Sequence, residues 1–446
     1  MTEKHLYDSN IKCFLIYLKN TMNQKTKDNQ LLKIVYRQFY YLWRKISGIL
    51  FVYYLRQTKF KTASRKDLLA NQQKYKIYKF GSEETVIFGD FYTPKPICPR
   101  IAKKIYRMKE KIIEPFVLEL EPAEIIGNYP VAFDRGRNLI LETTLPRFSD
   151  IETHIAKNVS LKTILASQLG KQDEQKPIEV ACILTNPWSN NFWHWTVDTL
   201  TQLEGVEYYQ QQTGIKPKLI VESNLRAWQR DSLEILGYKG NDLIYWQDFR
   251  RTVNKLVVPS FRRSYESNIG QEGIFNCGVR QIHGEISVNA CQWLKQKMLS
   301  NIDFLESDYA SFSPQVFISR RKALGRRISN ENEVLKSLKP LGFAEYILEE
   351  MSYLEQVKLF ALAKVIIAPH GAGLTNFIFA ENPIVLELFG AYVGREFANL
   401  ARGMGFKYGC LACPPPLGEV RQKDGDMLVD VKQMQNLLDM MQNNKQ

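Results

Sequence analysis

The most constraining feature of the sequence is an apolar run that ends at a glycine-containing turn. Residues 365–369 read VIIAP and are followed by HGAGLTN, a short helical pattern and a second apolar run, IVLELF, from Ile384. A continuous apolar run predicts a strand buried on both faces, which is typical of a parallel sheet. The order strand, glycine turn, helix, strand therefore predicts a nucleotide-binding half of a Rossmann-like α/β domain.

Apolar runs and helical patterns alternate along much of the remaining chain. The patterns predict strands over residues 116–120, 139–144, 179–185, 218–223, 242–246, 316–320 and 343–348, and helices from about 191, over 224–236, over 331–338 and from 352 to about 363. Ser352 and Glu355 have the spacing of a capping box, which marks the start of the last helix. Two such α/β regions in one chain predict a cleft between them.

Positive charge is concentrated at the N-terminus. The 446 residues carry a net charge of +13, and residues 1–80 hold 17 Lys and Arg against 4 Asp and Glu, which accounts for the whole excess. The rest of the chain is balanced, so its charge gives no argument for a nucleic-acid partner. No run of 18 uncharged apolar residues and no secretory signal pattern occurs, so neither a transmembrane helix nor a signal peptide is expected.

The basic segment also contains many aromatic residues. Residues 33–55 interleave Lys33, Arg37, Arg44 and Lys45 with tyrosine, phenylalanine and tryptophan. An amphipathic helix of this composition suits an anionic membrane surface. An N-terminal helix that packs on the fold with its cations in water is an equal alternative.

The seven cysteines are scattered, and the one close pair is Cys410 and Cys413. No second pair of this spacing and no His-x-His element accompanies it, whereas a zinc site needs four ligands. We therefore expect free thiols and no metal site.

The HGAGLTN turn has features of a phosphate-binding loop. Gly371 and Gly373 allow close approach of a ligand to the backbone, and the following helix would offer free N–H groups to phosphate. The turn lacks the third glycine of a dinucleotide fingerprint and the Gly-Lys-Ser/Thr of a Walker loop. A tight strand–helix turn that simply needs small residues is the alternative, with His370 a structural turn residue.

Cations gather at the carboxyl end of the predicted strand at residues 316–320. Ser319-Arg320-Arg321-Lys322 stands at this end, and Arg326-Arg327 comes shortly afterwards. Ligands in open α/β sheets bind beyond the carboxyl ends of the strands, and arginine suits diphosphate oxygens. The pattern thus favours a diphosphate site without metal over a solvated run of charges.

A third group of residues lies at a predicted helix start, NFWHWTVD. His194 and Asp198 are four residues apart and share a helix face, where a carboxylate can fix the tautomer of an imidazole that acts as a general base. Trp193 or Trp195 could present a ring to a sugar. A structural His–Asp pair among core aromatic residues is the alternative.

Taken together, three motifs resemble glycosyltransferase family 61, formerly a domain of unknown function. They are NFWHWTVDTL, VFISRRKALGRRISNENEVLKSL and LGFAEYILEEMSYLEQVKLFALAKVIIAPHGAGLTNFIFAENPIVLELF, and the resemblance covers roughly residues 85–420. It implies a GT-B-like architecture of two Rossmann-like domains facing across a cleft, an inverting mechanism and a nucleoside diphosphate sugar donor. Family members include plant xylosyltransferases, animal N-acetylglucosaminyltransferases and bacterial capsule enzymes, and this chain is similar to a bacterial-type member.

The resemblance also implies a domain division and site residues. Residues 1–80 would form the basic extension, 81–300 the acceptor-side domain and 301–446 the nucleotide-sugar-binding domain. His194 and Asp198 would be catalytic, and Glu387 would bond ribose hydroxyls. Donor-binding residues would be Ser319, Arg320, Arg321, Arg327, His370, Gly371, Ala372, Gly373, Thr375, Asn376 and Glu387, and acceptor-binding residues would be Asn191, Trp193 and Trp195.

These observations predict a hexosyl- or pentosyltransferase that acts on a glycan or lipid-linked glycan in cell-surface or capsular polysaccharide biosynthesis. No suitable Asp-x-Asp tract occurs, so we expect no metal requirement and no cofactor. The expected location is the cytoplasm, with the inner face of the membrane as a docking surface for residues 1–80. The alternative is a catalytically silent GT-B scaffold that binds glycan or membrane.

Overall fold

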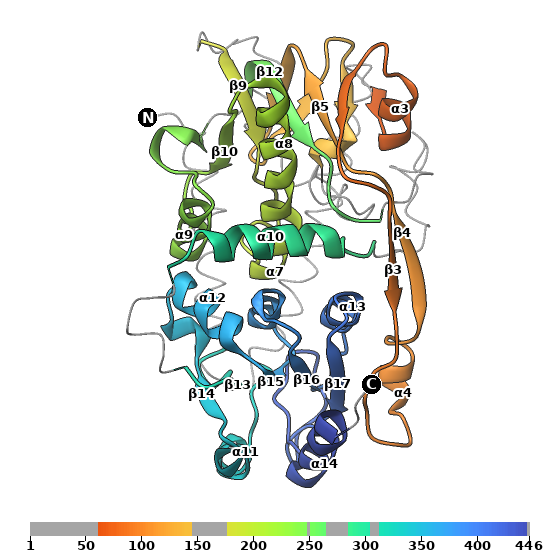
Figure 1. The fold of residues 1–446 in the computed structure, drawn as a ribbon, viewed down its shortest axis with the longest axis vertical. Coiled ribbons are helices and arrows are strands. Elements are labelled where there is room, and N and C mark those ends of the chain that lie inside the picture. Colours follow the sequence, from red (N-terminus) through yellow and green to blue (C-terminus); the bar gives the residue numbers. More distant parts are fainter. Residues whose placement is uncertain (1–60, 145–175, 248–249, 265–283, 304–311, 444–446) are drawn as a thin grey trace, which may run out of the picture.

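The computed structural model describes residues 61–144, 176–247, 250–264, 284–303 and 312–443. Two units lie one above the other in Figure 1, and each contains a β-sheet flanked by helices. The parallel strands and intervening helices confirm the expected α/β class. The basic and aromatic segment over 33–55 lies outside the described residues.

The larger unit is built on a ten-stranded mixed sheet. Strands β9, β10, β11 and β12 pair in parallel, while β5 and β6 run antiparallel to β12. Residues 61–79, which the sequence division placed in the basic extension, contribute the strands that pair with β8 and β5. The strands are β1 (Lys61–Ala63), β2 (Lys76–Lys79), β5 (Phe116–Leu120), β6 (Ala123–Ile126), β7 (Val131–Phe133), β8 (Asn138–Ile140), β9 (Ile178–Ile183), β10 (Lys218–Glu222), β11 (Leu243–Trp246) and β12 (Arg250–Pro259).

Helices and one hairpin complete this unit. The hairpin extends along the side of the molecule toward the lower unit in Figure 1. Its strands are β3 (Glu84–Phe88) and β4 (Met108–Ile112), which enclose α4 (Pro99–Ala102). The other helices are α3 (Arg65–Ala70), α7 (Phe192–His194), α8 (Leu203–Thr213), α9 (Ala227–Ile235) and α10 (Val288–Ser300), with short turns η1 (Leu141–Thr143) and η4 (Gly240–Asp242).

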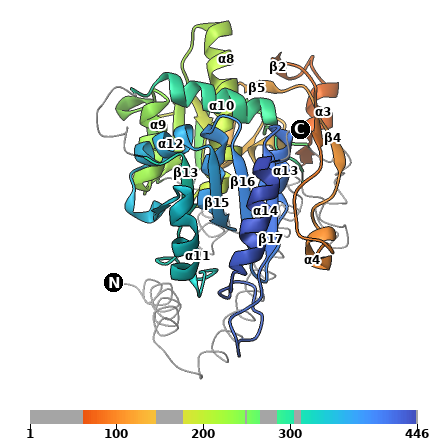
Figure 2. The same ribbon diagram turned by 60° about the horizontal axis from the view of Figure 1, so that its bottom comes forward.

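The smaller unit is a five-stranded parallel sheet in the order β14-β13-β15-β16-β17. Every residue of β15 is buried, as the apolar run predicts. Helix α14 lies over β16 and β17 on one face in Figure 2. The strands are β13 (Gln315–Ile318), β14 (Ala344–Tyr346), β15 (Val365–Pro369), β16 (Ile384–Phe389) and β17 (Lys407–Ala412), and the helices are α11 (Glu331–Leu338), α12 (Tyr353–Leu362), η9 (Ala372–Phe379), α13 (Glu396–Gly403) and α14 (Val431–Asn443), with short turns η7 (Lys339–Leu341) and η8 (Leu348–Glu350).

The two units share one hydrophobic core. Helix α12 packs on α9, and η9 packs on α7 and α10, so the helices between the sheets interlock. Buried side chains of both units, such as Leu219 and Phe389, belong to the same cluster. This packing fixes α7 of the larger unit against α13 and η9 of the smaller one.

Local signals in the sequence predicted several elements closely. The predicted helix Glu331–Leu338 matches α11, and the capping box of Ser352 and Glu355 begins α12, with both reciprocal hydrogen bonds formed. Three elements differ in type. The strand predicted over residues 139–144 ends at Ile140 and continues as the 3-10 turn η1. The segment after the glycine turn is a 3-10 helix, and α7 continues into a π-helical stretch, Trp195–Thr199, and a 3-10 turn, Leu200–Gln202. Such π segments are frequent at functional sites.

No helix among the described residues is long and apolar enough to cross a membrane. Within the same part of the chain, no three His, Cys, Asp or Glu side chains gather in a way that could hold a metal ion.

Candidate active site

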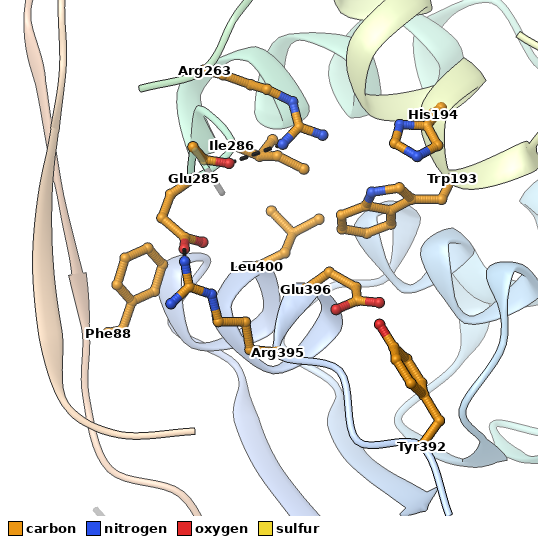
Figure 3. Close-up of a pocket in the computed structure, with 11 residues that line it drawn as sticks. Phe88, Trp193, His194, Arg263, Glu285, Ile286, Tyr392, Arg395, Glu396 and Leu400 are labelled. Atoms are coloured by element: carbon orange, nitrogen blue, oxygen red, sulfur yellow. Dashed lines mark hydrogen bonds and ion pairs between the residues drawn. The ribbon is translucent and has the colours of Figure 1, made fainter. Parts of the chain in front are cut away.

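A cavity of about 220 Å³ lies where the two units meet. The larger unit contributes α7, the residues that follow β12 and the residues that precede α10. The smaller unit contributes the start of α13 (Figure 3). Its wall is lined by Phe88, Trp193, His194, Arg263, Gly284, Glu285, Ile286, Tyr392, Arg395, Glu396 and Leu400. The cavity therefore lies between the two α/β units, where the sequence predicts a cleft, and His194 forms part of its wall.

His194 and Asp198 form the pair that their spacing predicts. The distance from His194 Nδ1 to Asp198 Oδ2 is 2.7 Å, and the His194 side chain is 16% exposed whereas that of Asp198 is 2% exposed. Arg263 donates to both oxygens of the same carboxylate, from Nε to Oδ1 and from Nη2 to Oδ2, the latter at 3.0 Å. The result is a buried Arg–Asp–His series that ends at the cavity.

The charge of this series is set by Arg263. Burial would raise the pKa of Asp198, but the guanidinium of Arg263 and the hydrogen bond from His194 outweigh burial and hold that pKa well below its usual range. Asp198 is therefore an ionised acceptor, so the proton of a neutral His194 sits on Nδ1. The Nε2 lone pair is then available at the cavity to take a proton.

The three expected acceptor-side residues have different positions. Trp193 lines the cavity and packs edge-on against Phe397 of α13, with ring centroids 4.8 Å apart. Asn191 is the N-cap of α7 and accepts the backbone N–H of His194. Trp195 is 1% exposed, and its indole N–H donates to Ser232 in the core. Trp195 thus differs from expectation, because on this helix it faces inward while Trp193 faces the cavity.

The histidine of the glycine turn is buried between two carboxylates. His370 Nδ1 lies 2.5 Å from Glu387 Oε1, and its Nε2 lies 3.5 Å from Glu396 Oε1. Burial would lower the pKa of His370, but the charge of Glu387, with the hydrogen bonds from the imidazole to both carboxylates, raises it to about 9. His370 is therefore a cation at neutral pH that donates to both groups.

Glu387 also differs from its expected role. Its side chain is fully buried, and its two oxygens accept hydrogen bonds from His370 and from the hydroxyl of Tyr408 at 2.5 Å. In the structure this carboxylate has no exposed surface, and it holds the imidazole of His370. The apolar surroundings of the run IVLELF explain this, since a carboxylate in a strand covered on both faces must find partners inside.

The arginines after β13 divide into two groups. Arg320 packs against Gly371, where a side chain would collide with its guanidinium, and Arg326 donates to the carbonyl of His370 at 3.1 Å. Arg321 instead pairs with Glu331 and Glu345, and Arg327 pairs with Asp426. The structure therefore favours Arg320 and Arg326 over Arg321 and Arg327 as cations of the glycine turn.

Arg326 has a backbone conformation that costs free energy. Its φ of 57° lies in the left-handed region, which is unfavourable by about 1–2 kcal/mol for a residue with a side chain. A backbone hydrogen bond to the carbonyl of Asp424 holds it there. Sequence reasoning noticed Arg326 in the charge run but did not select it.

The remaining residues of the turn serve mainly to pack it. Thr375 and Asn376 are fully buried, and they bond to the Ala372 carbonyl and to Gln356. A Cβ at Gly373 would lie 2.6 Å from Leu348 Cδ1, so a side chain there would make Leu348 shift. Ser319 is 1% exposed and accepts from the N–H groups of Arg321. Ala372 begins the 3-10 helix.

Sequence reasoning missed the residues of the cavity that come from distant segments. Arg263 lies in an unremarkable stretch, and Tyr392, Arg395 and Glu396 follow β16 without a motif. Arg395 pairs with Glu285 at 2.9 Å, and burial raises the pKa of Glu285 although Asn399 and Arg395 oppose it. Only tertiary packing brings these groups together.

Comparison with known sequences finds a family match in the central part of the chain. The family model described as Glycosyltransferase 61 matches residues 192–386. This stretch of the chain is similar to glycosyltransferase family 61. The family region begins at α7 and ends within β16, so it contains His194, Asp198, Arg320 and the glycine turn. It does not contain Tyr392 or Glu396.

Curated relatives are EGF domain-specific O-linked N-acetylglucosamine transferases. The chicken (Gallus gallus) protein is 29% identical over 119 residues, covering 25% of this chain and 22% of the relative. The dog (Canis lupus familiaris) protein is 29% identical over 119 residues, covering 25% and 23%. The rat (Rattus norvegicus) protein is 32% identical over 100 residues, covering 21% and 19%. The chain thus matches about a fifth of the length of these relatives.

Proposed function

We propose that this chain is an inverting glycosyltransferase that moves a sugar from a nucleoside diphosphate sugar to a glycan acceptor. The observation that carries the proposal is the Arg263–Asp198–His194 series, which ends at a cavity between two α/β units. The family match over residues 192–386 supports transferase chemistry at this place. In this proposal the two units act as the two domains of a GT-B-like enzyme.

In the proposed mechanism His194 is the general base. Its Nε2 takes the proton of an acceptor hydroxyl while that oxygen bonds to the anomeric carbon. The bond from the anomeric carbon to the diphosphate oxygen breaks, and its electron pair leaves with the diphosphate. Asp198 stays ionised and stabilises the imidazolium that forms. Attack opposite the leaving group inverts the anomeric centre.

The charge that grows on the diphosphate needs cations on the other side of the reaction. Arg320 and Arg326 at the glycine turn are suited to this role, because guanidinium groups bind phosphate oxygens with directed hydrogen bonds. Backbone N–H groups near Gly371 and Ala372 would add to them. We propose that these groups act without a divalent metal.

The acceptor and the pathway belong to the same proposal. We infer a glycan or lipid-linked glycan acceptor in cell-surface or capsular polysaccharide biosynthesis, bound on the side of Trp193. A membrane contact through the basic N-terminal segment would bring the enzyme to such an acceptor.

A panel of nucleoside diphosphate sugars tests the proposed function. Purified protein with each donor, with and without EDTA, is assayed for nucleoside diphosphate release. We expect release with one or a few donors and little change on chelation. Release with no donor would support a silent glycan-binding scaffold, and loss of turnover in EDTA that manganese restores would refute the metal-free mechanism.

The two groups of arginines predict different effects on nucleotide binding. Arg320→Ala should weaken the affinity for the cognate nucleoside diphosphate by roughly 1.5–3 kcal/mol, the size of one charge-assisted hydrogen bond. Arg327→Ala is the matched control, because Arg327 pairs with Asp426 on the surface and should change this affinity little. Titration calorimetry measures the affinity of both variants. An equal loss of affinity in the two would contradict the assignment of Arg320 to the diphosphate site.

A further inference from the structure

Glu396 is the first residue of α13, and its side chain reaches the cavity from the smaller unit. Figure 3 shows its carboxylate on the side of the cavity opposite Arg263, with Tyr392 pointing toward it. The Glu396 side chain is 31% exposed, whereas the two partners of its network, His370 and Glu387, are 4% and 0% exposed. Of these three groups, Glu396 is the one that a ligand in the cavity can reach.

The position of this carboxylate is fixed from behind. His370 Nε2 lies 3.5 Å from Glu396 Oε1, and His370 is itself held by Glu387 at 2.5 Å. The aromatic rings of Phe389, Tyr392 and Phe397 surround the imidazole, with centroids 5.1–5.4 Å away. The buried His370–Glu387 pair therefore lies directly behind the Glu396 carboxylate.

Gly394 provides the space for this arrangement. A Cβ at Gly394 would lie 2.5 Å from Glu396 Oε2 and 2.6 Å from Oε1, so a side chain there would make the Glu396 carboxylate shift. The φ of Gly394 is not in the left-handed region, so a substitution would act through this contact and not through backbone conformation. The absence of a side chain at Gly394 thus leaves room for the Glu396 carboxylate in its observed position.

The charges indicate a role beyond neutralising His370. One carboxylate, Glu387, suffices to balance a buried imidazolium, yet a second carboxylate is placed beside the same ring. The neighbouring cation, Arg395, pairs with Glu285. Of the side chains of His370, Glu387 and Glu396, that of Glu396 is the one that lines the cavity. A fixed carboxylate of this kind accepts hydrogen bonds from hydroxyl groups, which sugar rings carry in adjacent pairs.

We propose that Glu396 binds sugar hydroxyls in the cavity, and that His370 and Gly394 are positioning residues for its carboxylate. This inference rests on the proposed function and adds the residue that would recognise a sugar ring. The hydroxyls belong either to the transferred sugar of the donor or to the acceptor, and the experiment separates the two sources.

The test compares Glu396→Gln with wild type in three measurements: KM for the donor, KM for the acceptor, and Kd for the nucleoside diphosphate alone. We expect one KM to rise about ten- to a hundredfold, as for the loss of a charge-assisted hydrogen bond, with the nucleoside diphosphate Kd unchanged. A rise in donor KM assigns the transferred sugar, and a rise in acceptor KM assigns the acceptor. Glu381→Gln, at an exposed position of the same unit, is the control.

Gly394→Ala tests positioning without touching a charge. It should raise the same KM as Glu396→Gln, and in the Glu396→Gln background it should add little, because both changes act on one contact. Unchanged KM values in Glu396→Gln would overturn the proposal, as would full additivity of the two substitutions. If wild type turns over no donor, the proposed function fails by itself. Calorimetric binding of free oligosaccharides to wild type and Glu396→Gln then decides on Glu396, and equal binding overturns its role.

Discussion

The His194→Ala protein is expected to lose about 100-fold or more of kcat while its Kd for the nucleoside diphosphate stays nearly unchanged. The reason is geometric: the imidazole lies at the cavity wall, while the cations assigned to the diphosphate lie at the glycine turn of the other unit. Removing the base therefore slows proton transfer without removing a nucleotide contact. Single-turnover kinetics together with titration calorimetry separates the two effects.

Asp198→Asn is the companion to this experiment. It keeps the shape of the side chain but removes the charge that fixes the His194 tautomer, so we expect a similar or smaller loss of kcat and a shifted acidic limb of the pH profile. A dead Asp198→Asn enzyme beside a normal His194→Ala enzyme would exchange the two roles. Near-normal turnover of both variants would make the helix purely structural.

Arg263→Met is expected to destabilise the fold by about 3–5 kcal/mol, the usual effect of removing one partner of a buried ion pair. The side chains of Arg263 and Asp198 are each 2% exposed, so the substitution removes the guanidinium from a buried carboxylate and leaves it with the His194 imidazole as a partner. Denaturant unfolding followed by fluorescence measures the change. The matched control is Arg327→Met, whose pair with Asp426 is 49% and 22% exposed and should contribute less than about 1 kcal/mol.

The pH dependence of stability has a definite sign here. The folded pKa of Asp198 lies below its ordinary value of 3.8, so the ion pair stabilises the fold above that pH and the contribution is lost as the pH falls further. The difference in the free energy of unfolding between wild type and Arg263→Met should therefore become smaller in acid. An equal effect of the Arg263 and Arg327 substitutions at neutral pH would contradict the buried ion pair.

Much of the fold followed from local patterns. The apolar run at 365–369 predicted a strand buried on both faces, and β15 is buried throughout. Helical periodicity predicted α11, and the capping box predicted the start of α12, because these signals lie within a few residues. The pairing of residues 61–79 with β8 and β5 has no such local signal, since it depends on strands distant in the chain.

The residues of the site also divide into those that local sequence signals predicted and those that only the fold brings together. The spacing of His194 and Asp198 predicted a contact within one helix, and the two side chains meet at 2.7 Å. Arg263 completes that pair from 65 residues away, and no periodicity connects the two positions. Arg321 and Arg327 look equivalent to Arg320 in sequence, but carboxylates that lie nearby only in the fold pair with them. Charge patterns thus predicted where cations gather but not which of them face the turn.

The central claim is a single displacement at the anomeric carbon with His194 as base, and the anomer first released from the donor tests it most directly. Water can replace the acceptor in slow donor hydrolysis, so rapid ¹H NMR reads the configuration of the free sugar before it equilibrates. The account predicts that an α-linked donor first gives the β sugar, and that His194→Ala suppresses this release. First appearance of the α sugar would contradict a one-step inverting mechanism.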